Sequence, residues 1–192
     1  MSKPAARLAT YDDLLALPED VRAEIVKGQV NTSPGPLPKH SRAVRTLGSF
    51  IGKPFDDDDG RGGPGGWWIL VEVDIRLSPH DILRPDLSGW RRTRLPEPWD
   101  IRPIDVVPDW VCEVTSPSNV AYDRVTKANL YARHGVPNFW LLDPSERVLE
   151  SFELADGVWV RIGSYDENAN ARVKPFEQIE LSVGGLFPPK SS

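Results

Sequence analysis

A strand, a helix and a second strand between residues 110 and 142 constrain the fold of this chain most. Trp110–Val114 is apolar on both faces apart from Glu113, which is typical of a strand in the middle of a sheet. Residues 120–134 have helical periodicity, Gly135 follows as a helix terminator, and Asn138–Leu142 is a second apolar run. A strand–helix–strand unit of this length predicts two neighbouring parallel strands and therefore an α/β domain.

The remaining segments predict further strands and two helices. Apolar spacing and proline positions predict helices over 11–17 and 40–55, and a strand pair over 22–31 that bends at Lys27-Gly28. Alternation of apolar and charged residues predicts one strand over 67–77, and a strand over 82–90 split by Pro85 would form a hairpin with it. Strands over 148–154 and 158–162 follow, and residues 178–187 are expected to cover a sheet edge.

The length of 192 residues suits one domain, expected over 10–187 with flexible ends at 1–9 and 188–192. Four consecutive aspartates and five glycines over 56–66 predict a solvated loop. The single cysteine, Cys112, excludes an intrachain disulfide and a Cys-based zinc site.

No apolar run approaches the roughly 20 residues that span a bilayer, so we expect a cytoplasmic protein without a membrane partner.

The formal net charge of −5 is unusual for a protein that binds nucleic acid. A metal-dependent nuclease nevertheless needs carboxylates, and bound cations offset part of their charge. Five arginines fall between residues 84 and 102, and one interpretation is a strip that contacts phosphates. They are Arg84, Arg91, Arg92, Arg94 and Arg102. A solvated loop explains the same residues equally well.

Glu113 needs a partner, because an ionised carboxylate in a buried strand loses its hydration. A structural ion pair is one explanation, and a metal site is another. Asp86 lies in the segment Arg-Pro-Asp-Leu, and if its strand neighbours Trp110–Val114 both carboxylates point into one cleft. A divalent cation would relieve their repulsion, since it takes carboxylate, water and phosphate oxygens as ligands.

Lys127 is the third candidate and belongs to the helix predicted over 120–134, which follows a turn that offers Ser118 or Asn119 as its cap. A stripe of small residues is expected to pack this helix on the sheet, namely Ala121, Val125, Ala128 and Ala132. Lys127 lies at the edge of that stripe, where its long stem would let the ammonium reach the sheet. The alternative is an exposed pair with Asp123 four residues earlier.

The order of motifs along residues 10–187 resembles the Uma-two family, whose members are described as restriction endonucleases of the PD-(D/E)XK nuclease superfamily. The resemblance is most specific in Glu-Val-Thr-Ser-Pro-Ser from residue 113 and Gly-Val-Pro-Asn-Phe-Trp from residue 135. Tyr-Asp-Asp-Leu-Leu-Ala-Leu-Pro from residue 11, Glu-Ile-Val-Lys-Gly from residue 24 and Arg-Pro-Asp-Leu from residue 84 also match, as does Asp-Arg-Val-Thr-Lys from residue 123.

The resemblance implies a restriction-endonuclease-like mixed β-sheet flanked by helices, with a divalent-metal site. It assigns the family Asp to Asp86, the family Glu to Glu113 and an N-terminal acidic position to Glu24. The superfamily lysine usually stands two residues after the Glu, where this chain has Thr115. The resemblance implies that in this family the lysine has moved to the next helix, and Lys127 fits that position. Gln29 departs from the Gly-Glu pair that is common after the first strand.

The hypothesis is therefore a phosphodiester hydrolase that depends on Mg²⁺ or Mn²⁺ and cuts DNA, with no organic cofactor. Asp86 and Glu113 would hold the metal, while Lys127 and Glu24 would assist. His40 either contacts a phosphate or is simply solvated at a helix start. Cutting both strands of a duplex favours a homodimer. Two alternatives stay open: a catalytically idle module that binds nucleic acid or protein on the same fold, and a metal hydrolase of another class.

Overall fold

A computed structural model describes residues 7–57, 63–117 and 120–190. Its main element is a six-stranded sheet with the strand order β10-β9-β8-β7-β6-β3. The strands are β3 (Trp67–Val71), β6 (Leu87–Arg91), β7 (Trp110–Val114), β8 (Asn138–Asp143), β9 (Val148–Ala155) and β10 (Val158–Asp166). β7 and β8 are parallel and all other neighbours are antiparallel. The parallel pair and the mixed sheet confirm the prediction of an α/β fold.

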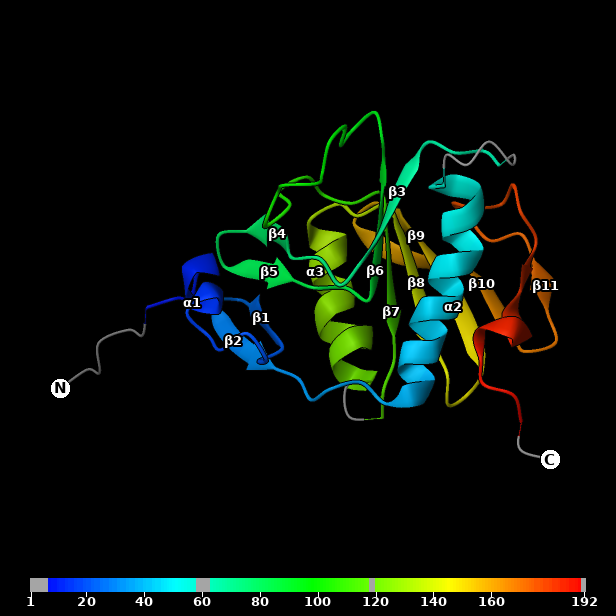
Figure 1. Ribbon diagram of the computed structural model, residues 1–192, viewed down its shortest axis with the longest axis horizontal. Coiled ribbons are helices and arrows are strands. Elements are labelled where there is room, and N and C mark those ends of the chain that lie inside the picture. The colour runs from blue at the N-terminus through cyan, green and yellow to red at the C-terminus, as the bar shows by residue number, and fades with distance from the viewer. Residues whose placement is uncertain (1–6, 58–62, 118–119, 191–192) are drawn as a thin grey trace.

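Helices cover both faces of this sheet (Figure 1). On one face α2 (Pro38–Phe55) packs into the larger core cluster, which contains Leu47 and Ile51 of the helix with Trp110 and Trp140 of the strands. On the other face α3 (Ala128–Arg133) buries Leu130 and Tyr131 against Val111 and Leu141. Successive side chains of a strand point to opposite faces, so β7 directs Trp110, Cys112 and Val114 to one side and Glu113 to the other.

A smaller sheet with the order β2-β1-β5-β4 lies beside the main sheet (Figure 1). It consists of β1 (Ala23–Val26), β2 (Gln29–Thr32), β4 (Ile75–Ser78) and β5 (Asp81–Leu83), and α1 (Tyr11–Leu15) packs on β1. Near the C-terminus, β11 (Asn170–Ala171) pairs with β12 (Leu181–Ser182), and the 3-10 helix η2 (Val183–Leu186) contacts α2 and the edge strand β10. Within the described residues no helix is both long and apolar enough to cross a membrane.

Some expectations concern residues that the structure describes only in part. Of the loop expected over 56–66, residues 58–62 lie outside the described ranges. The same is true of residues 1–6 and 191–192 in the two ends that we expected to be flexible. The expected helix cap at Ser118 or Asn119 also lies outside them.

The single strand predicted over 67–77 is wrong. β3 ends at Val71 and β4 begins at Ile75, and the two strands belong to different sheets. β3 pairs with β6, while the expected hairpin across residues 78–81 joins β4 to β5 only. The chain turns between the sheets at Glu72, whose φ of 51° is unusual for a residue with a side chain. Apolar and charged residues alternate on both sides of Glu72, so periodicity alone did not reveal the break.

The helix predicted over 120–134 is present but begins differently from the expectation. Tyr122–Lys127 forms a π-helical segment, η1, before α3, and Gly135 follows with a φ of 76°, as expected for a residue after a helix C-cap. The predicted packing stripe is wrong, because Ala121 is exposed and Val125 is 57% exposed. The buried side chains of η1 are instead Asp123 and Lys127.

Candidate active site

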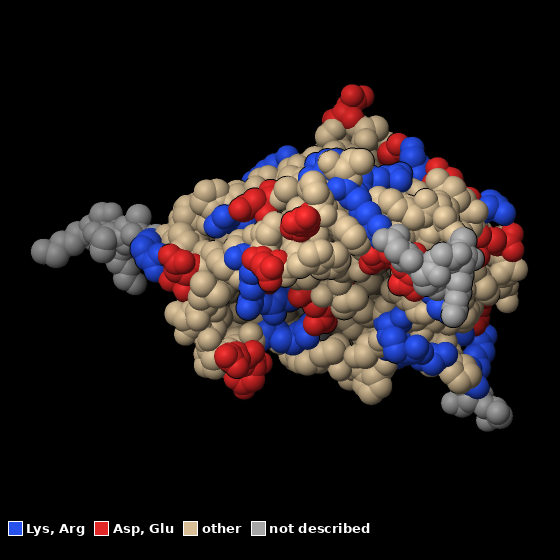
Figure 2. Space-filling model, turned by 45° about the horizontal axis from the view of Figure 1, so that its top comes forward, with Lys and Arg blue, Asp and Glu red and all other residues tan. Residues whose placement is uncertain are grey.

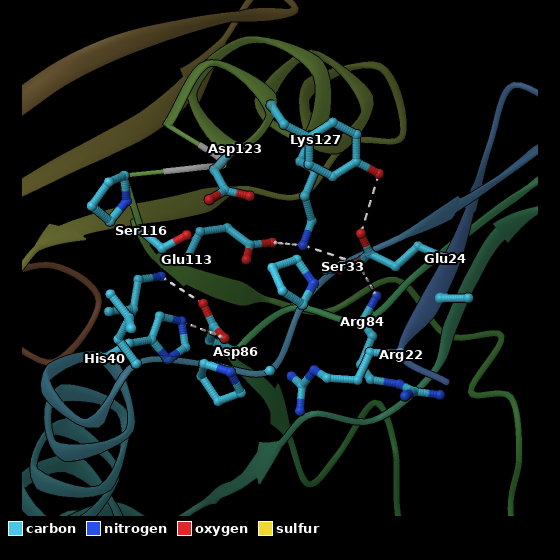
Figure 3. Close-up of a pocket in the computed structure, with 18 residues that line it drawn as sticks. Arg22, Glu24, Ser33, His40, Arg84, Asp86, Glu113, Ser116, Asp123 and Lys127 are labelled. Carbon is cyan, nitrogen blue, oxygen red and sulfur yellow. Dashed lines mark hydrogen bonds and ion pairs between the residues drawn. The ribbon is translucent and has the colours of Figure 1, made fainter. Parts of the chain in front are cut away.

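A cavity of about 320 Å³ lies where η1, the end of β7 and the start of α2 meet the smaller sheet (Figure 3). The segment from Ser33 to Leu37, which links β2 to α2, forms one wall. The acidic and basic side chains that line the cavity come from five separate stretches of the chain. They are Arg22, Glu24, His40, Arg84, Asp86, Glu113, Asp123 and Lys127. The cavity therefore collects six of the candidates that the sequence suggested, from positions far apart in the chain.

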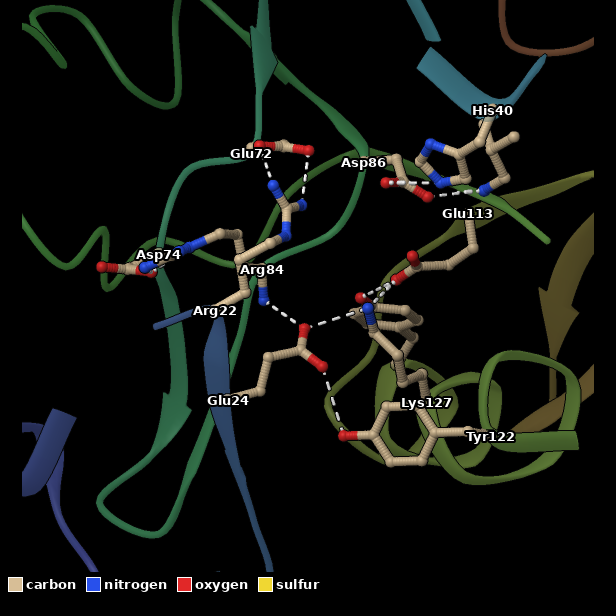
Figure 4. A network of polar contacts seen from close by, with 12 residues as sticks. Arg22, Glu24, His40, Glu72, Asp74, Arg84, Asp86, Glu113, Tyr122 and Lys127 are labelled. Carbon is tan, nitrogen blue, oxygen red and sulfur yellow. Dashed lines mark hydrogen bonds and ion pairs between the residues drawn. The ribbon is translucent and has the colours of Figure 1, made fainter. Parts of the chain in front are cut away.

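Asp86 lies directly before β6, next to the end of β7. Its Oδ2 accepts a hydrogen bond of 2.7 Å from the backbone N–H of Val114, which fixes the carboxylate to the neighbouring strand. His40 Nε2, from the first turn of α2, is 3.2 Å from Oδ1 (Figure 4). Burial lowers the pKa of His40, but the hydrogen bond and the charge of Asp86 outweigh it, so the pKa of His40 is raised.

Glu113 is 2% exposed and faces the helix η1–α3. Its Oε1 is 2.7 Å from Lys127 Nζ and accepts a hydrogen bond of 2.5 Å from the Tyr131 hydroxyl. Burial raises the pKa of Glu113 well above its usual value. Lys127 opposes this shift, whereas the nearby carboxylates of Asp123, Asp86 and Glu24 add to it. Glu113 thus pairs directly with one cation, Lys127, while three further carboxylates lie near enough to raise its pKa.

Lys127 is 4% exposed and bridges two carboxylates, because its Nζ is also 3.0 Å from Glu24 Oε1. Burial lowers the pKa of Lys127, but the charges of Glu113 and Glu24 outweigh it and the pKa is raised. The alternative of an exposed Asp123–Lys127 pair is therefore wrong. Glu24 is held in turn by the backbone N–H of Arg84 at 2.6 Å and the Tyr122 hydroxyl at 3.2 Å (Figure 4).

Asp123 is the remaining carboxylate of the cavity and is 6% exposed. Figure 3 shows its carboxylate turned toward Glu113. Burial raises the pKa of Asp123 to about 7, Lys127 opposes the shift, and Asp86 and Glu24 add to it. Like Lys127, it is a polar residue on the buried face of a helix, and helical periodicity alone assigns such residues to solvent.

The arginines expected to form one phosphate-contacting strip fall into three sets with different partners, one of which is Arg94 alone, paired with Asp109 at 2.7 Å. Arg84 and Arg102 both pair with the buried Asp74, although Arg84 also lines the cavity. Arg91 and Arg92 do not line it and lie instead over the rings of Trp67 and Trp68. Acidic and basic side chains are interspersed on the face shown in Figure 2. Contact of these arginines or of His40 with nucleic acid remains a prediction.

The sequence reasoning missed Arg22 and Tyr122, which both line the cavity. Arg22 pairs with Glu72 at 2.6 Å, and Tyr122 binds Glu24. Arg22 stands two residues before Glu24, the spacing that places side chains on one face of an extended chain, so that spacing was an available signal. Tyr122 is brought to the cavity by the π-helical segment, which apolar periodicity does not predict.

Carboxylate oxygens are the donors that a hard divalent cation prefers, and Asp86 and Glu113 both line this cavity. In the part of the chain that the structure describes, no three Asp, Glu, His or Cys side chains form a group that would hold a metal ion. Any cation at Asp86 and Glu113 would therefore complete its coordination with water or substrate oxygens, as Mg²⁺ commonly does.

Comparison with known proteins supports the fold and identifies the family. A crystal structure described as a putative nuclease belonging to DUF820, from Anabaena variabilis ATCC 29413, superposes with a TM-score of 0.72 and 24% sequence identity. The match covers 93% of this chain and 97% of that chain, and it confirms the restriction-endonuclease-like fold. A cryo-electron microscopy structure of a DrdV–DNA complex matches over 67% of this chain and 12% of that one, with 14% identity. Its TM-score of 0.33 is too low to show a shared fold.

No curated protein matches this chain. The model of the Uma2 (Uma-two) family, which is described as "Putative restriction endonuclease", matches residues 8–184. This range contains the described cavity and nearly all of the sheet, helices and core. The chain therefore belongs to the Uma2 family.

Proposed function

We propose that this protein is a divalent-metal-dependent phosphodiester hydrolase of the PD-(D/E)XK type, and that it cuts DNA. Membership of a nuclease-like family supports the reaction class. The proposal rests mainly on one observation: Asp86, Glu113 and Lys127 line the same cavity, and Lys127 Nζ lies 2.7 Å from Glu113 Oε1. Two carboxylates and a buried ammonium suit a reaction in which a metal and a fixed cation stabilise negative charge on phosphorus oxygens.

The donor set in the cavity fits Mg²⁺ or Mn²⁺. Neighbouring carboxylates raise the pKa of Glu113, in addition to the effect of burial, and a cation bound beside Glu113 would oppose both effects by stabilising the charged carboxylate. Asp86 and Glu113 would be the protein ligands. A bound divalent ion would polarise the phosphodiester and lower the pKa of a bound water.

The protein's own side chains would position the reacting groups. Lys127 carries its charge on a side chain that is almost completely buried, so it would stabilise the charge that develops on the phosphate more strongly than a solvated lysine. Glu24 would orient Lys127 through the 3.0 Å ion pair and is itself fixed by Arg84 and Tyr122. Loss of Glu24 should therefore weaken catalysis by misplacing Lys127 rather than by removing a metal ligand.

The proposal also includes DNA as the substrate, a homodimer as the active form and a cytoplasmic location. One cavity per chain cleaves one strand, so a two-fold dimer would present two cavities to the two strands of a duplex. Arg84 and His40 lie at the cavity and would contact the phosphate nearest to the cleaved bond. Arg91 and Arg92 would contact DNA farther away.

The test is incubation of the purified protein with supercoiled plasmid DNA and Mg²⁺ or Mn²⁺. The wild type should nick the DNA, and Asp86→Ala, Glu113→Gln and Lys127→Ala should not. Asp12→Asn, which removes an exposed carboxylate from α1, is the control for net charge and should nick like the wild type. Mn²⁺ should also raise the melting temperature of the wild type but not of Glu113→Gln. Failure of the wild type to nick any substrate would instead favour the idle binding module.

A further inference from the structure

Asp123 differs from the other carboxylates of the cavity in its partners. Asp86 binds Val114 and His40, Glu113 binds Lys127 and Tyr131, and Glu24 binds Lys127, Tyr122 and the backbone of Arg84. Among the described residues, Asp123 has neither a hydrogen bond nor an ion pair. Its side chain is nevertheless more than nine-tenths buried and lines the cavity.

A mostly buried carboxylate without a protein partner destabilises a protein, because it has lost part of its hydration and gained no hydrogen bond or ion pair in exchange. Burying it in a cavity with three other acids adds repulsion to that loss. Asp123 is placed there by the π-helical segment Tyr122–Lys127, and such segments occur frequently at functional sites. The arrangement suits a carboxylate whose partner is part of the reaction.

We propose that Asp123 is a further catalytic residue of this cavity, the general base that accepts the proton of the attacking water. This inference rests on the proposed phosphodiester hydrolysis. Lys127 is a poor candidate for the same role, because its ammonium is held by two carboxylates and its pKa is raised. Asp123 has both oxygens free to accept, within the part of the chain that the structure describes.

The step balances without any further reagent. The water oxygen forms a bond to phosphorus, and its proton moves to a carboxylate oxygen of Asp123. The bond between phosphorus and the leaving alkoxide oxygen breaks, and that oxygen takes a proton from solvent. Asp123 then releases its proton to solvent, so that the sum is one water consumed, with one phosphate monoester and one alcohol formed.

The surroundings of Asp123 support proton exchange near neutral pH. Burial raises its pKa to about 7, and the facing groups are Glu113 on β7, Lys127 on the same helix, Asp86 before β6, Glu24 on β1 and His40 on α2. Lys127 and His40 oppose the shift, and Asp86 and Glu24 increase it. A general base is most effective when its pKa lies close to the working pH.

The experiment compares wild type, Asp123→Asn, Asp123→Glu and the surface control Asp12→Asn. Cleavage of a defined oligonucleotide is measured from about pH 5.5 to 9 with Mn²⁺, and the melting temperature is measured with and without Mn²⁺. Asp123→Asn should lower the cleavage rate by roughly 10²- to 10⁴-fold. The wild-type rate should rise with pH and then level off, whereas the residual rate of Asp123→Asn should keep rising. Asp123→Glu should recover part of the rate and restore the plateau.

The Mn²⁺-induced rise in melting temperature should persist in Asp123→Asn, because Asp123 is not proposed as a metal ligand. Wild-type cleavage together with an unchanged rate or pH profile in Asp123→Asn would overturn this inference and leave the proposed function intact. Loss of the Mn²⁺ response, as expected for Glu113→Gln, would also overturn it and make Asp123 a ligand. No cleavage by the wild type would overturn the proposed function, and the role of Asp123 with it.

Discussion

Lys127 Nζ lies 2.7 Å from Glu113 Oε1, and both side chains are at least nine-tenths buried. Burying either charge without the other costs hydration free energy, and the ion pair offsets that cost only while both partners are present. Glu24 is the second partner of Lys127. The stability of the protein around the cavity should therefore depend on the same residues that are proposed to carry its function.

Replacing Lys127 by methionine should lower the free energy of unfolding by about 3–5 kcal/mol, because Glu113 and Glu24 would lose their shared cation. Urea unfolding measures the change. The double variant Lys127→Met/Glu113→Gln should recover part of the loss, since it no longer buries an unpaired charge at Glu113. Lys53→Met, at an exposed position on α2, is the matched control. A loss no greater than that of the control would contradict the prediction.

Tyr131→Phe should destabilise the protein more than Tyr122→Phe. Tyr131 is fully buried and donates to the buried Glu113 at 2.5 Å, whereas Tyr122 is half-buried and donates to Glu24 at 3.2 Å. Both acceptors are carboxylates, and a hydrogen bond to a charged group contributes about 1.5–3 kcal/mol; the Tyr131 bond should lie toward the upper end, because it is shorter and more completely buried. Both losses are measured by urea unfolding at the same pH. The reverse order would mean that Glu113 does not depend on the Tyr131 hydroxyl.

His40 should stabilise the protein in a pH-dependent way. Its folded-state pKa is raised, so its contribution is complete below the pKa of the unfolded state and is lost as the pH rises through the folded-state pKa. His40→Gln should therefore cost more stability at about pH 5.5 than at about pH 8.5. His80→Gln is the comparison, because the His80 ring contacts the backbone oxygen of Ala9 instead of a carboxylate. An equal cost of His40→Gln at both pH values would rule out the Asp86 pair as its origin.

Much of the fold follows from local patterns in the sequence. The apolar runs of β7 and β8 required buried strands, and the helical spacing between them required a crossover, which together define a parallel pair. Glu113 was identified by the same reasoning, because a lone carboxylate in such a run needs an explanation. The position of Asp86 depended on pairing between β6 and β7, and the structure shows that pairing.

The rest depended on tertiary contacts that local patterns do not contain. The chain breaks at Glu72 because the two halves of one alternating segment pair with strands of different sheets. The packing face of η1 was misjudged because Asp123 and Lys127 point inward while Val125 points outward. Apolar periodicity assigns the opposite orientation to these residues. Functional sites are where local preference and global structure are expected to disagree.

The π-helical segment makes a final prediction about register. Its i→i+5 hydrogen bonds accommodate one more residue per turn than an α-helix, so deleting Val125, which is 57% exposed, should convert it to α-helix. Packing of Leu130 and Tyr131 would hold α3 and Lys127 in place. Residues before the deletion would rotate by roughly 100°, the angle per residue of an α-helix, and Asp123 would leave the cavity.

The deletion variant should therefore remain folded, with a helical signal in circular dichroism close to that of the wild type. It should retain the Lys127 contribution to stability, tested by adding Lys127→Met, and lose cleavage by at least about 10²-fold. Val125→Ala, which keeps the register, should cleave like the wild type. Wild-type cleavage by the deletion variant would show that the orientation of Asp123 does not depend on the π-helical segment. The substitution and the deletion alter the same exposed position. A difference in cleavage rate between the two variants would therefore come from the helix register and not from loss of the Val125 side chain.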